Sequence, residues 1–142
     1  ACFGAERLYV VGHVPERSRI KASSGSLIDY VEIISFSTPR EFMEHVLQQK
    51  MQVVAAELVE GAKSLSSYNF DFNVPLVVVV GNEQTGVPAE IIQNSDVVCI
   101  EMPGVGYCLN TSQTANVLLY EAVRQYESFI SEELKFRTNY IT

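Results

Sequence analysis

The fold is decided by residues 76–86, which read Leu76-Val77-Val78-Val79-Val80-Gly81-Asn82-Glu83-Gln84-Thr85-Gly86. The first five residues are apolar and mostly β-branched, which predicts a buried strand. The glycines that follow let the backbone of a loop come close to a ligand. Because ligands in open α/β sheets bind beyond the carboxyl ends of the strands, this loop is predicted to form one side of a small-molecule pocket.

A second loop of the same kind follows another apolar run. Residues 97–100 read Val97-Val98-Cys99-Ile100, and residues 104–112 read Gly104-Val105-Gly106-Tyr107-Cys108-Leu109-Asn110-Thr111-Ser112. We expect both loops to line one pocket, built largely from main chain. Ile100, Met102 and Leu109 would flank a flat ring such as adenine, with backbone groups reading its edges. For Ile100 and Leu109 an ordinary place in the core is the alternative.

Five runs rich in β-branched residues alternate with helical segments, which predicts an α/β fold with a mostly parallel, five- to six-stranded sheet and helices on both faces. The expected strands are residues 7–11, 30–36, 51–57, 76–80 and 97–100. The expected helices are residues 15–21, 38–50, 88–94 and 111–135.

Two of these helices carry further signals. Thr38, Pro39 and Glu41 make a capping box that starts the second helix, which is expected to turn Phe42, Val46 and Leu47 toward the sheet. In the last helix, apolar residues recur at helical spacing and predict one core-facing stripe. Its members are Ala115, Leu118, Leu119, Ala122, Tyr126, Phe129 and Ile130. Val117 and Tyr120 fall outside the stripe, for contact with either a partner subunit or a loop.

Composition limits the class of protein. The chain has 142 residues, 47% of them hydrophobic, which suits one domain with a substantial core. No apolar run reaches the roughly 20 residues that span a bilayer, so no membrane partner is expected. Three cysteines without CxxC spacing predict neither a disulfide framework nor a zinc site, and favour an intracellular, cytoplasmic setting. His13 and His45 have no spaced ligand partners, so no metal is expected.

The charge is unusual for a protein that binds nucleic acid. The net charge is −7, whereas such proteins usually have a basic surface. The basic residues Arg17, Arg19 and Lys21 lie close together, and they would either contact phosphates or form a solvated helix face.

The two loops resemble motifs two and three of the SpoU branch of the SPOUT class, whose members are RNA ribose 2′-O-methyltransferases. The resemblant residues are Gly81-Asn82-Glu83-x-x-Gly86 and, downstream, Ile100-x-Met102 with Cys108-Leu109-Asn110-x-Ser112. The resemblance runs from about residue 1 to residue 126. It implies a trefoil knot near the C-terminus, S-adenosylmethionine as cofactor, a tRNA or rRNA substrate and a homodimer.

The resemblance also implies site residues. It places Glu83, Cys108, Asn110 and Ser112 in the catalytic site. It implies a cofactor-binding set of Ala55, Ala56, Glu57, Gly81, Asn82, Gly86, Ile100, Met102, Gly106, Cys108 and Leu109. From the residues alone, Glu83 is equally well an exposed loop acid, and Asn110 and Ser112 are ordinary N-caps for the helix that follows.

Two departures from the family pattern bear on activity. Cys108 stands where motif three has serine, and a thiol is a weaker hydrogen-bond donor than a hydroxyl. Residues 1–5 match only the end of motif one, whose Asn and Arg lie upstream, and Arg7 does not match that arginine. We therefore expect residues 1–142 to be a single SpoU-type domain that is truncated at its N-terminus.

The expected function is transfer of a methyl group from S-adenosylmethionine to a ribose 2′-hydroxyl of tRNA or rRNA. The alternative is a catalytically weak or inactive module that binds the cofactor or dimerises in RNA processing. The acidic charge and Cys108 favour that alternative. An unrelated α/β nucleotide-binding domain is a third reading.

Overall fold

The computed structural model describes residues 1–106 and 108–130, and its backbone contacts group into two compact units. The first unit is Ala1–Gln49 and the second begins at Lys50. Each unit is described by itself.

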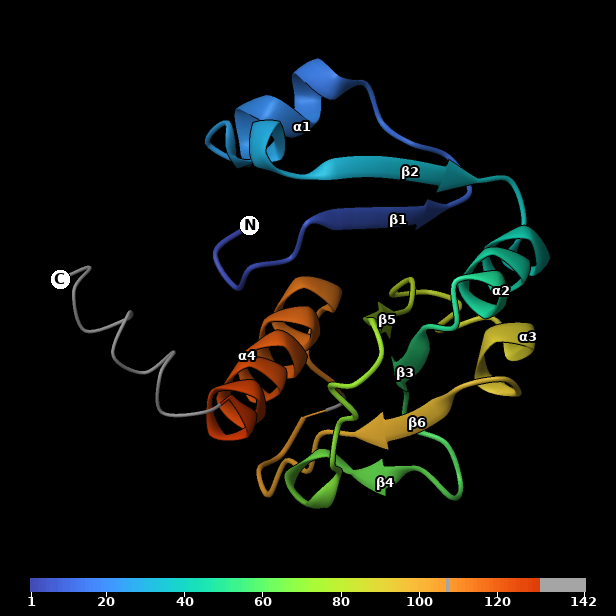
Figure 1. The fold of residues 1–142 in the computed structure, drawn as a ribbon, viewed down its shortest axis with the longest axis vertical. Helices are drawn as coiled ribbons and strands as arrows, with labels where there is room; N and C mark the ends of the chain where they lie inside the picture. The colour runs from blue at the N-terminus through green and yellow to red at the C-terminus, as the bar shows by residue number, and fades with distance from the viewer. Residues whose placement is uncertain (107, 131–142) are drawn as a thin grey trace, which may run out of the picture. The chain divides into compact units, whose positions relative to one another are not determined.

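The first unit pairs two strands in parallel. β1 (Arg7–Val11) lies beside β2 (Glu32–Phe36), with Arg7 opposite Glu32 and Val11 opposite Phe36 (Figure 1). Between them come α1 (Arg17–Ser23) and the short 3-10 helix η1 (Leu27–Tyr30). The strand predicted over residues 30–36 therefore begins two residues late, because Tyr30 closes η1.

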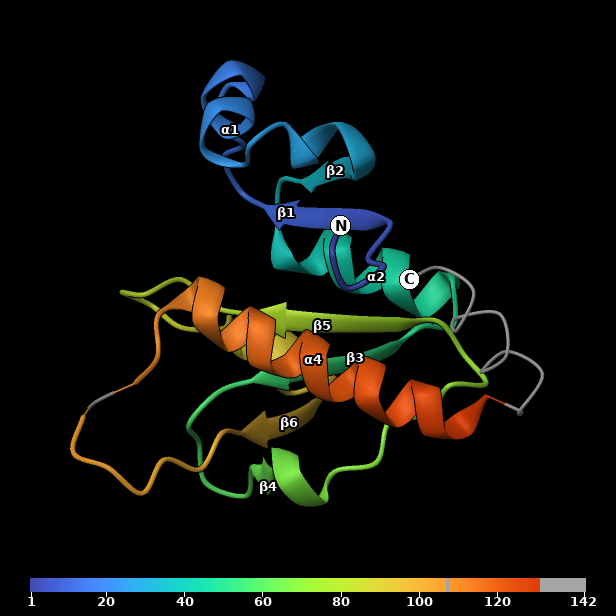
Figure 2. The ribbon, with the colours of Figure 1, turned by 90° about the vertical axis from the view of Figure 1, so that its left-hand side faces the viewer.

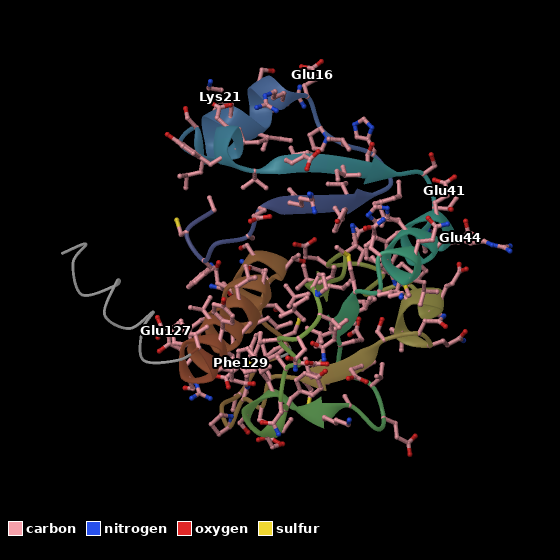
Figure 3. The ribbon with its side chains drawn as sticks, viewed as in Figure 1. Glu16, Lys21, Glu41, Glu44, Glu127 and Phe129 are labelled. Atoms are coloured by element: carbon pink, nitrogen blue, oxygen red, sulfur yellow. The ribbon has the colours of Figure 1, made fainter. Side chains whose placement is uncertain are left out.

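The capping box starts α2 (Pro39–Gln48) as predicted. The Glu41 amide donates to Thr38 Oγ1 at 3.2 Å, and the Glu41 carboxylate accepts from the Ser37 amide at 2.9 Å. Figure 3 labels Glu41 and Glu44 on this helix. Phe42 and Val46 are buried as expected, but Leu47 is 62% exposed, so its predicted inward position is wrong. Met43 is buried instead, because the inward face of α2 runs through positions 42, 43 and 46.

The second unit is built on a four-stranded parallel sheet. Its strands are β3 (Gln52–Ala56), β4 (Lys63–Ser64), β5 (Leu76–Val80) and β6 (Asp96–Cys99), in the order β4-β6-β3-β5. The predicted α/β class with parallel strands is confirmed. In place of one five- to six-stranded sheet, the described strands form a sheet of two and a sheet of four. β4 has only two residues, too few for a sequence pattern to reveal.

Helix α4 (Thr111–Phe129) covers one face of this sheet and runs along β5 (Figure 2). The short helix α3 (Ala89–Ile92) lies on the other side of β3 (Figure 1). The core under α4 is apolar except for the Tyr68 hydroxyl. It consists of Val54, Leu65, Tyr68, Phe70, Val98, Leu118 and Ala122.

The stripe predicted on the last helix is only partly buried. Leu118 and Ala122 are buried, whereas Tyr126 is 42% and Phe129 is 53% exposed. These two rings, of which Figure 3 labels Phe129, pack beside Phe72 at centroid distances of 5.4 and 5.7 Å. Residues 131–135 of the predicted helix lie outside the described residues. The knot, the single domain and the N-terminal truncation stay predictions.

Candidate functional site

A cavity of about 660 Å³ opens at the carboxyl edge of the four-stranded sheet. All four strands are parallel, so the segments that leave β3, β5 and β6 emerge at the same edge, where the start of α4 joins them. The lining residues are Ala56, Glu57, Leu58, Val59, Val80, Gly81, Asn82, Glu83, Thr85, Gly86, Val87, Ile92, Val98, Cys99, Ile100, Met102, Cys108, Leu109, Asn110, Thr111 and Thr114.

The loop from Gly81 to Val87 folds back on itself after β5. The Gly86 amide donates to the Asn82 carbonyl at 2.8 Å, and the Asn82 amide donates to the Gly86 carbonyl at 3.3 Å. Asn82 Oδ1 also accepts from the Gln84 amide at 2.8 Å. A Cβ atom at Gly81 would lie 2.3 Å from the Gly86 carbonyl carbon, so this fold of the loop requires glycine at position 81.

Glu57 ties this loop to the end of β3. Its carboxylate accepts from the Val87 amide at 2.9 Å through one oxygen and from the Leu58 amide at 3.0 Å through the other. Gly86 has φ +70°, and a Cβ there would lie 2.5 Å from Glu57 Oε2. A side chain at position 86 would therefore be strained and would also displace the carboxylate.

Asn110 begins α4 as an N-cap and also lines the cavity. Its Oδ1 accepts from the Gln113 amide at 2.9 Å and from the Ser112 hydroxyl at 2.9 Å. Capping occupies the side-chain oxygen only, so the Asn110 amide nitrogen keeps its capacity to donate to a ligand. Both interpretations of Asn110, cap and site residue, are thus compatible with its position.

Thr111 joins α4 to the loop after β5. Its hydroxyl donates to the Gly81 carbonyl at 2.9 Å. The pKa of the Glu83 carboxyl is held below its ordinary value, first by the backbone amide of Glu83 itself and next by the side chain of Thr111. Glu83 is consequently ionised at neutral pH.

Most of the site residues expected from the sequence lie around this one cavity. They are Ala56, Glu57, Gly81, Asn82, Glu83, Gly86, Ile100, Met102, Cys108, Leu109 and Asn110. Three lie outside its lining: Ala55 is fully buried within β3, Gly106 is exposed, and Ser112 points its hydroxyl at Asn110.

The other lining residues are not among those expected from the sequence. They are Leu58, Val59, Val80, Thr85, Val87, Ile92, Val98, Cys99, Thr111 and Thr114. Thr114 lies one helical turn after Asn110 on the same face of α4, a spacing that could have indicated it. For Leu58, Val59 and Ile92 no signal in the sequence points to the cavity.

The basic residues of α1 are partly neutralised within the first unit. Arg17 and Lys21 both pair with Asp29, at 3.0 and 2.8 Å, and Figure 3 labels Lys21 on this helix. Hydrogen bonds from Lys21, and then from Arg17, lower the pKa of the Asp29 carboxyl. This arrangement agrees with a solvated helix face more closely than with a set of free cations for phosphate.

Within residues 1–106 and 108–130, no three His, Cys, Asp or Glu side chains come together as a metal site would require. Over the same residues, no helix has the length and apolar character to cross a membrane.

Comparison with known proteins identifies the family of this chain. The model of the SpoU rRNA Methylase family matches residues 1–120. The tRNA (guanosine(18)-2′-O)-methyltransferase of Aquifex aeolicus (strain VF5) is 31% identical over 130 residues, which are 89% of this chain and 61% of that protein. The 23S rRNA (uridine(2479)-2′-O)-methyltransferase of Streptomyces viridochromogenes is 31% identical over 128 residues, covering 86% of this chain and 44% of that protein. The chain thus spans less than two thirds of either relative.

Solved structures of SpoU enzymes are also similar to this chain. The crystal structure of the A. aeolicus TrmH/SpoU tRNA modifying enzyme has a TM-score of 0.77 and 29% identity, over 89% of this chain and 64% of that one. The SpoU methyltransferase AviRb from Streptomyces viridochromogenes, in complex with the cofactor AdoMet, has a TM-score of 0.73 and 29% identity, over 89% of this chain and 52% of that one. Motifs, fold and relatives agree, and the chain belongs to the SpoU rRNA methylase family.

Proposed function

We propose that this chain is the cofactor-binding domain of an RNA ribose 2′-O-methyltransferase that uses S-adenosylmethionine and acts on tRNA or rRNA. The observation that carries the proposal is the cavity in which the segments matching motifs two and three lie together. The relatives from A. aeolicus and S. viridochromogenes, named as 2′-O-methyltransferases of tRNA and 23S rRNA, support the reaction. The AdoMet complex of AviRb supports the cofactor.

The cavity suits S-adenosylmethionine in size and chemistry. Its volume of about 660 Å³ lies within the range of roughly 300–1,000 Å³ usual for small-molecule sites. Ile100, Met102 and Leu109 give it apolar walls, and the glycine loop brings main-chain groups to its surface. The crowded backbone around Gly81 leaves no space for a side chain there, so main chain forms that wall.

The residues of this chain bind the cofactor and orient it for methyl transfer. S-adenosylmethionine, when bound, supplies a methyl group activated by its positively charged sulfur. In-line transfer depends on precise placement of the reacting atoms, which loops fixed by hydrogen bonds provide. Asn110 offers amide donors at the start of α4, and the ionised Glu83 offers acceptors at the rim of the cavity.

Activation of the ribose hydroxyl needs a base or a charged partner. The resemblance assigns this role to the arginine of motif one, which no residue of this chain matches.

The test joins two assays. The chain is first titrated with S-adenosylhomocysteine, and then methyl transfer from labelled S-adenosylmethionine to unmodified tRNA and rRNA is measured. The transfer assay is repeated with a version that carries a motif-one segment, including its Asn and Arg, ahead of Ala1. Binding together with transfer by the extended protein supports the proposal. Binding without any transfer in either form overturns the enzymatic assignment.

The second candidate is a module that binds the cofactor without catalysis. The specific observation in its favour is Cys108, an exposed thiol at the cavity where the family has a serine hydroxyl. A Cys108→Ser variant of the extended protein separates the two. Transfer that remains at zero, with the cofactor still bound, favours the non-catalytic module.

We also propose that the protein is a homodimer in an intracellular compartment. The exposed apolar side chains of α4 support a partner surface, since Val117 is 37% and Tyr120 is 60% exposed. The three free cysteines, Cys2, Cys99 and Cys108, support a reducing compartment. Sedimentation at tens of micromolar that shows only monomer would contradict the dimer.

A further inference from the structure

The loop from Gly81 to Val87 is held at both of its ends by side chains from other elements. Glu57 comes from the end of β3 and lies 30 positions from Val87 in the sequence. Thr111 comes from the first turn of α4 and lies 30 positions from Gly81. Glu57 Oε2 accepts from the Val87 amide and the Thr111 hydroxyl donates to the Gly81 carbonyl, so each side chain holds main chain of the loop.

We propose that Glu57 and Thr111 are positioning residues, which hold the Gly81–Val87 loop in the shape that receives the ligand. This inference rests on the proposed function of the same cavity. It gives Glu57 a different role from that of a direct cofactor contact, which the resemblance implied.

Near the Val87 end of the loop, both carboxylate oxygens of Glu57 accept hydrogen bonds from main-chain amides. One accepts from Val87 at 2.9 Å and the other from Leu58 at 3.0 Å. Gly86 completes this end, because the carboxylate occupies the space where a Cβ would stand.

Thr111 holds the opposite end of the loop, at Gly81. The hydroxyl fixes the Gly81 carbonyl at 2.9 Å, immediately after the last residue of β5. The side chains of Asn110 and Asn82 further fix the backbone, because each accepts a hydrogen bond from a nearby amide within its own segment. The loop is thus determined by contacts that exist before any ligand arrives, which reduces the ordering cost of binding.

Four variants test the proposal. Glu57→Gln keeps the volume of the side chain but leaves one oxygen where two amides need acceptors. Its control is Glu60→Gln, which removes the same charge from an exposed position that does not line the cavity. Thr111→Val removes the hydroxyl at nearly constant volume. Its control is Thr111→Ser, which retains the hydroxyl.

Three quantities are measured on each variant: the Kd for S-adenosylhomocysteine, the melting temperature, and the hydrogen-exchange rate of the Val87 amide without ligand. We expect Glu57→Gln and Thr111→Val each to weaken binding about tenfold. Glu60→Gln and Thr111→Ser should remain within about twofold of the parent. Val87 exchange should accelerate in Glu57→Gln alone, and bound ligand should restore its protection.

The outcomes separate the proposals. Weakened binding in Glu57→Gln with unchanged Val87 exchange would mean a direct ligand contact and would overturn the positioning role. Faster exchange with unchanged Kd would also overturn it. If the parent protein binds no S-adenosylhomocysteine, the proposed function fails, and the positioning of a ligand fails with it. The exchange rates would still report whether Glu57 holds the loop.

Discussion

The two edges of the four-stranded sheet use polar side chains in opposite ways. At the amino edge, the Tyr68 hydroxyl donates to Asp96 at 2.6 Å and accepts from the Gln52 amide at 3.1 Å, which joins the starts of β3 and β6. At the carboxyl edge, Glu57 and Thr111 bind main-chain atoms of the loop after β5. The first edge is closed by side chains that satisfy each other, whereas the second is held open around a cavity.

The difference separates side chains that stabilise the fold from side chains that shape the cavity. At the amino edge, Gln125 extends the network by accepting from the Phe70 amide and donating to the Tyr68 carbonyl. Its members therefore have their partners within the protein. At the carboxyl edge, the side chains shape a backbone and leave it facing a hollow. Variants at the amino edge should thus change stability alone, and variants at the carboxyl edge should change binding.

The largest effect is expected from Gly81→Ala. The new Cβ would meet backbone atoms, the Gly86 carbonyl carbon at 2.3 Å and the Val87 nitrogen at 2.4 Å, and backbone cannot move aside cheaply. We expect a loss of about 3 kcal/mol in the free energy of unfolding, together with loss of ligand binding. Urea denaturation and calorimetry measure the two effects.

Gly104→Ala is the matched control, because nothing lies within 4 Å of a Cβ at Gly104. Equal behaviour of the two variants would contradict the packed geometry of the loop after β5.

Tyr68→Phe tests the amino edge and should have the next largest effect. It removes the hydroxyl that joins Asp96 and Gln52, so we expect a loss of about 1–2 kcal/mol in unfolding free energy with an unchanged Kd for S-adenosylhomocysteine. Tyr30→Phe, at a 78% exposed position, is the control and should be neutral. Weaker binding of S-adenosylhomocysteine by Tyr68→Phe would contradict the statement that the amino edge affects stability alone.

The same tyrosine predicts a pH dependence. Burial, and next the hydrogen bond with Asp96, raise the pKa of the Tyr68 hydroxyl above its ordinary value. Because the folded pKa is raised, this stabilisation is complete below the ordinary tyrosine pKa and is lost as the pH rises through the folded value. Absorbance titration of the folded protein should show a tyrosine ionisation above the ordinary tyrosine pKa, and Tyr68→Phe should lack it.

Cys108→Ser is expected to have a smaller effect, at the carboxyl edge. A hydroxyl donates more strongly than a thiol, so affinity for S-adenosylhomocysteine should rise about threefold with little change in melting temperature. Cys2→Ser, at an exposed cysteine outside the cavity lining, is the control. An unchanged affinity would mean that the thiol takes no part in ligand binding.

The smallest effect concerns Glu83. Its pKa is lowered, first by its own backbone amide and then by Thr111, so its contribution to the loop is present above the ordinary carboxyl pKa and is lost as the pH falls through the folded value. An NMR titration should show the Glu83 carboxyl ionising below the ordinary carboxyl pKa. In Thr111→Val the Glu83 pKa should move back toward the ordinary value. An unchanged Glu83 pKa in Thr111→Val would contradict this effect of Thr111 on Glu83.

The sequence predicted those parts of the molecule that local pattern determines. The strand before Gly81, the capping box at Thr38 and the N-cap at Asn110 all follow from neighbouring residues, and the structure confirms each. The sharp turn of the loop after β5 was also foreseeable, because glycines mark its first and sixth positions.

The sequence could not predict contacts between distant segments. Glu57 meets Val87, and Thr111 meets Gly81, across 30 positions in each case, and no periodicity reports such a pairing. Leu47 is expected to face the sheet, but the buried face of α2 runs through Phe42, Met43 and Val46 instead. The resemblance implies Ala55 at the cavity, and the structure buries it within β3, where residues on both faces of the strand are buried.

Calorimetric titration of this chain with S-adenosylhomocysteine, with ATP as the control, tests directly whether the cavity binds the cofactor. We expect saturable binding of the S-adenosyl compound, weak or no binding of ATP, and about 2.7 kcal/mol of stabilisation at a ligand concentration of about 100 Kd. Absence of binding by a folded protein, or equal affinity for ATP, would contradict this expectation.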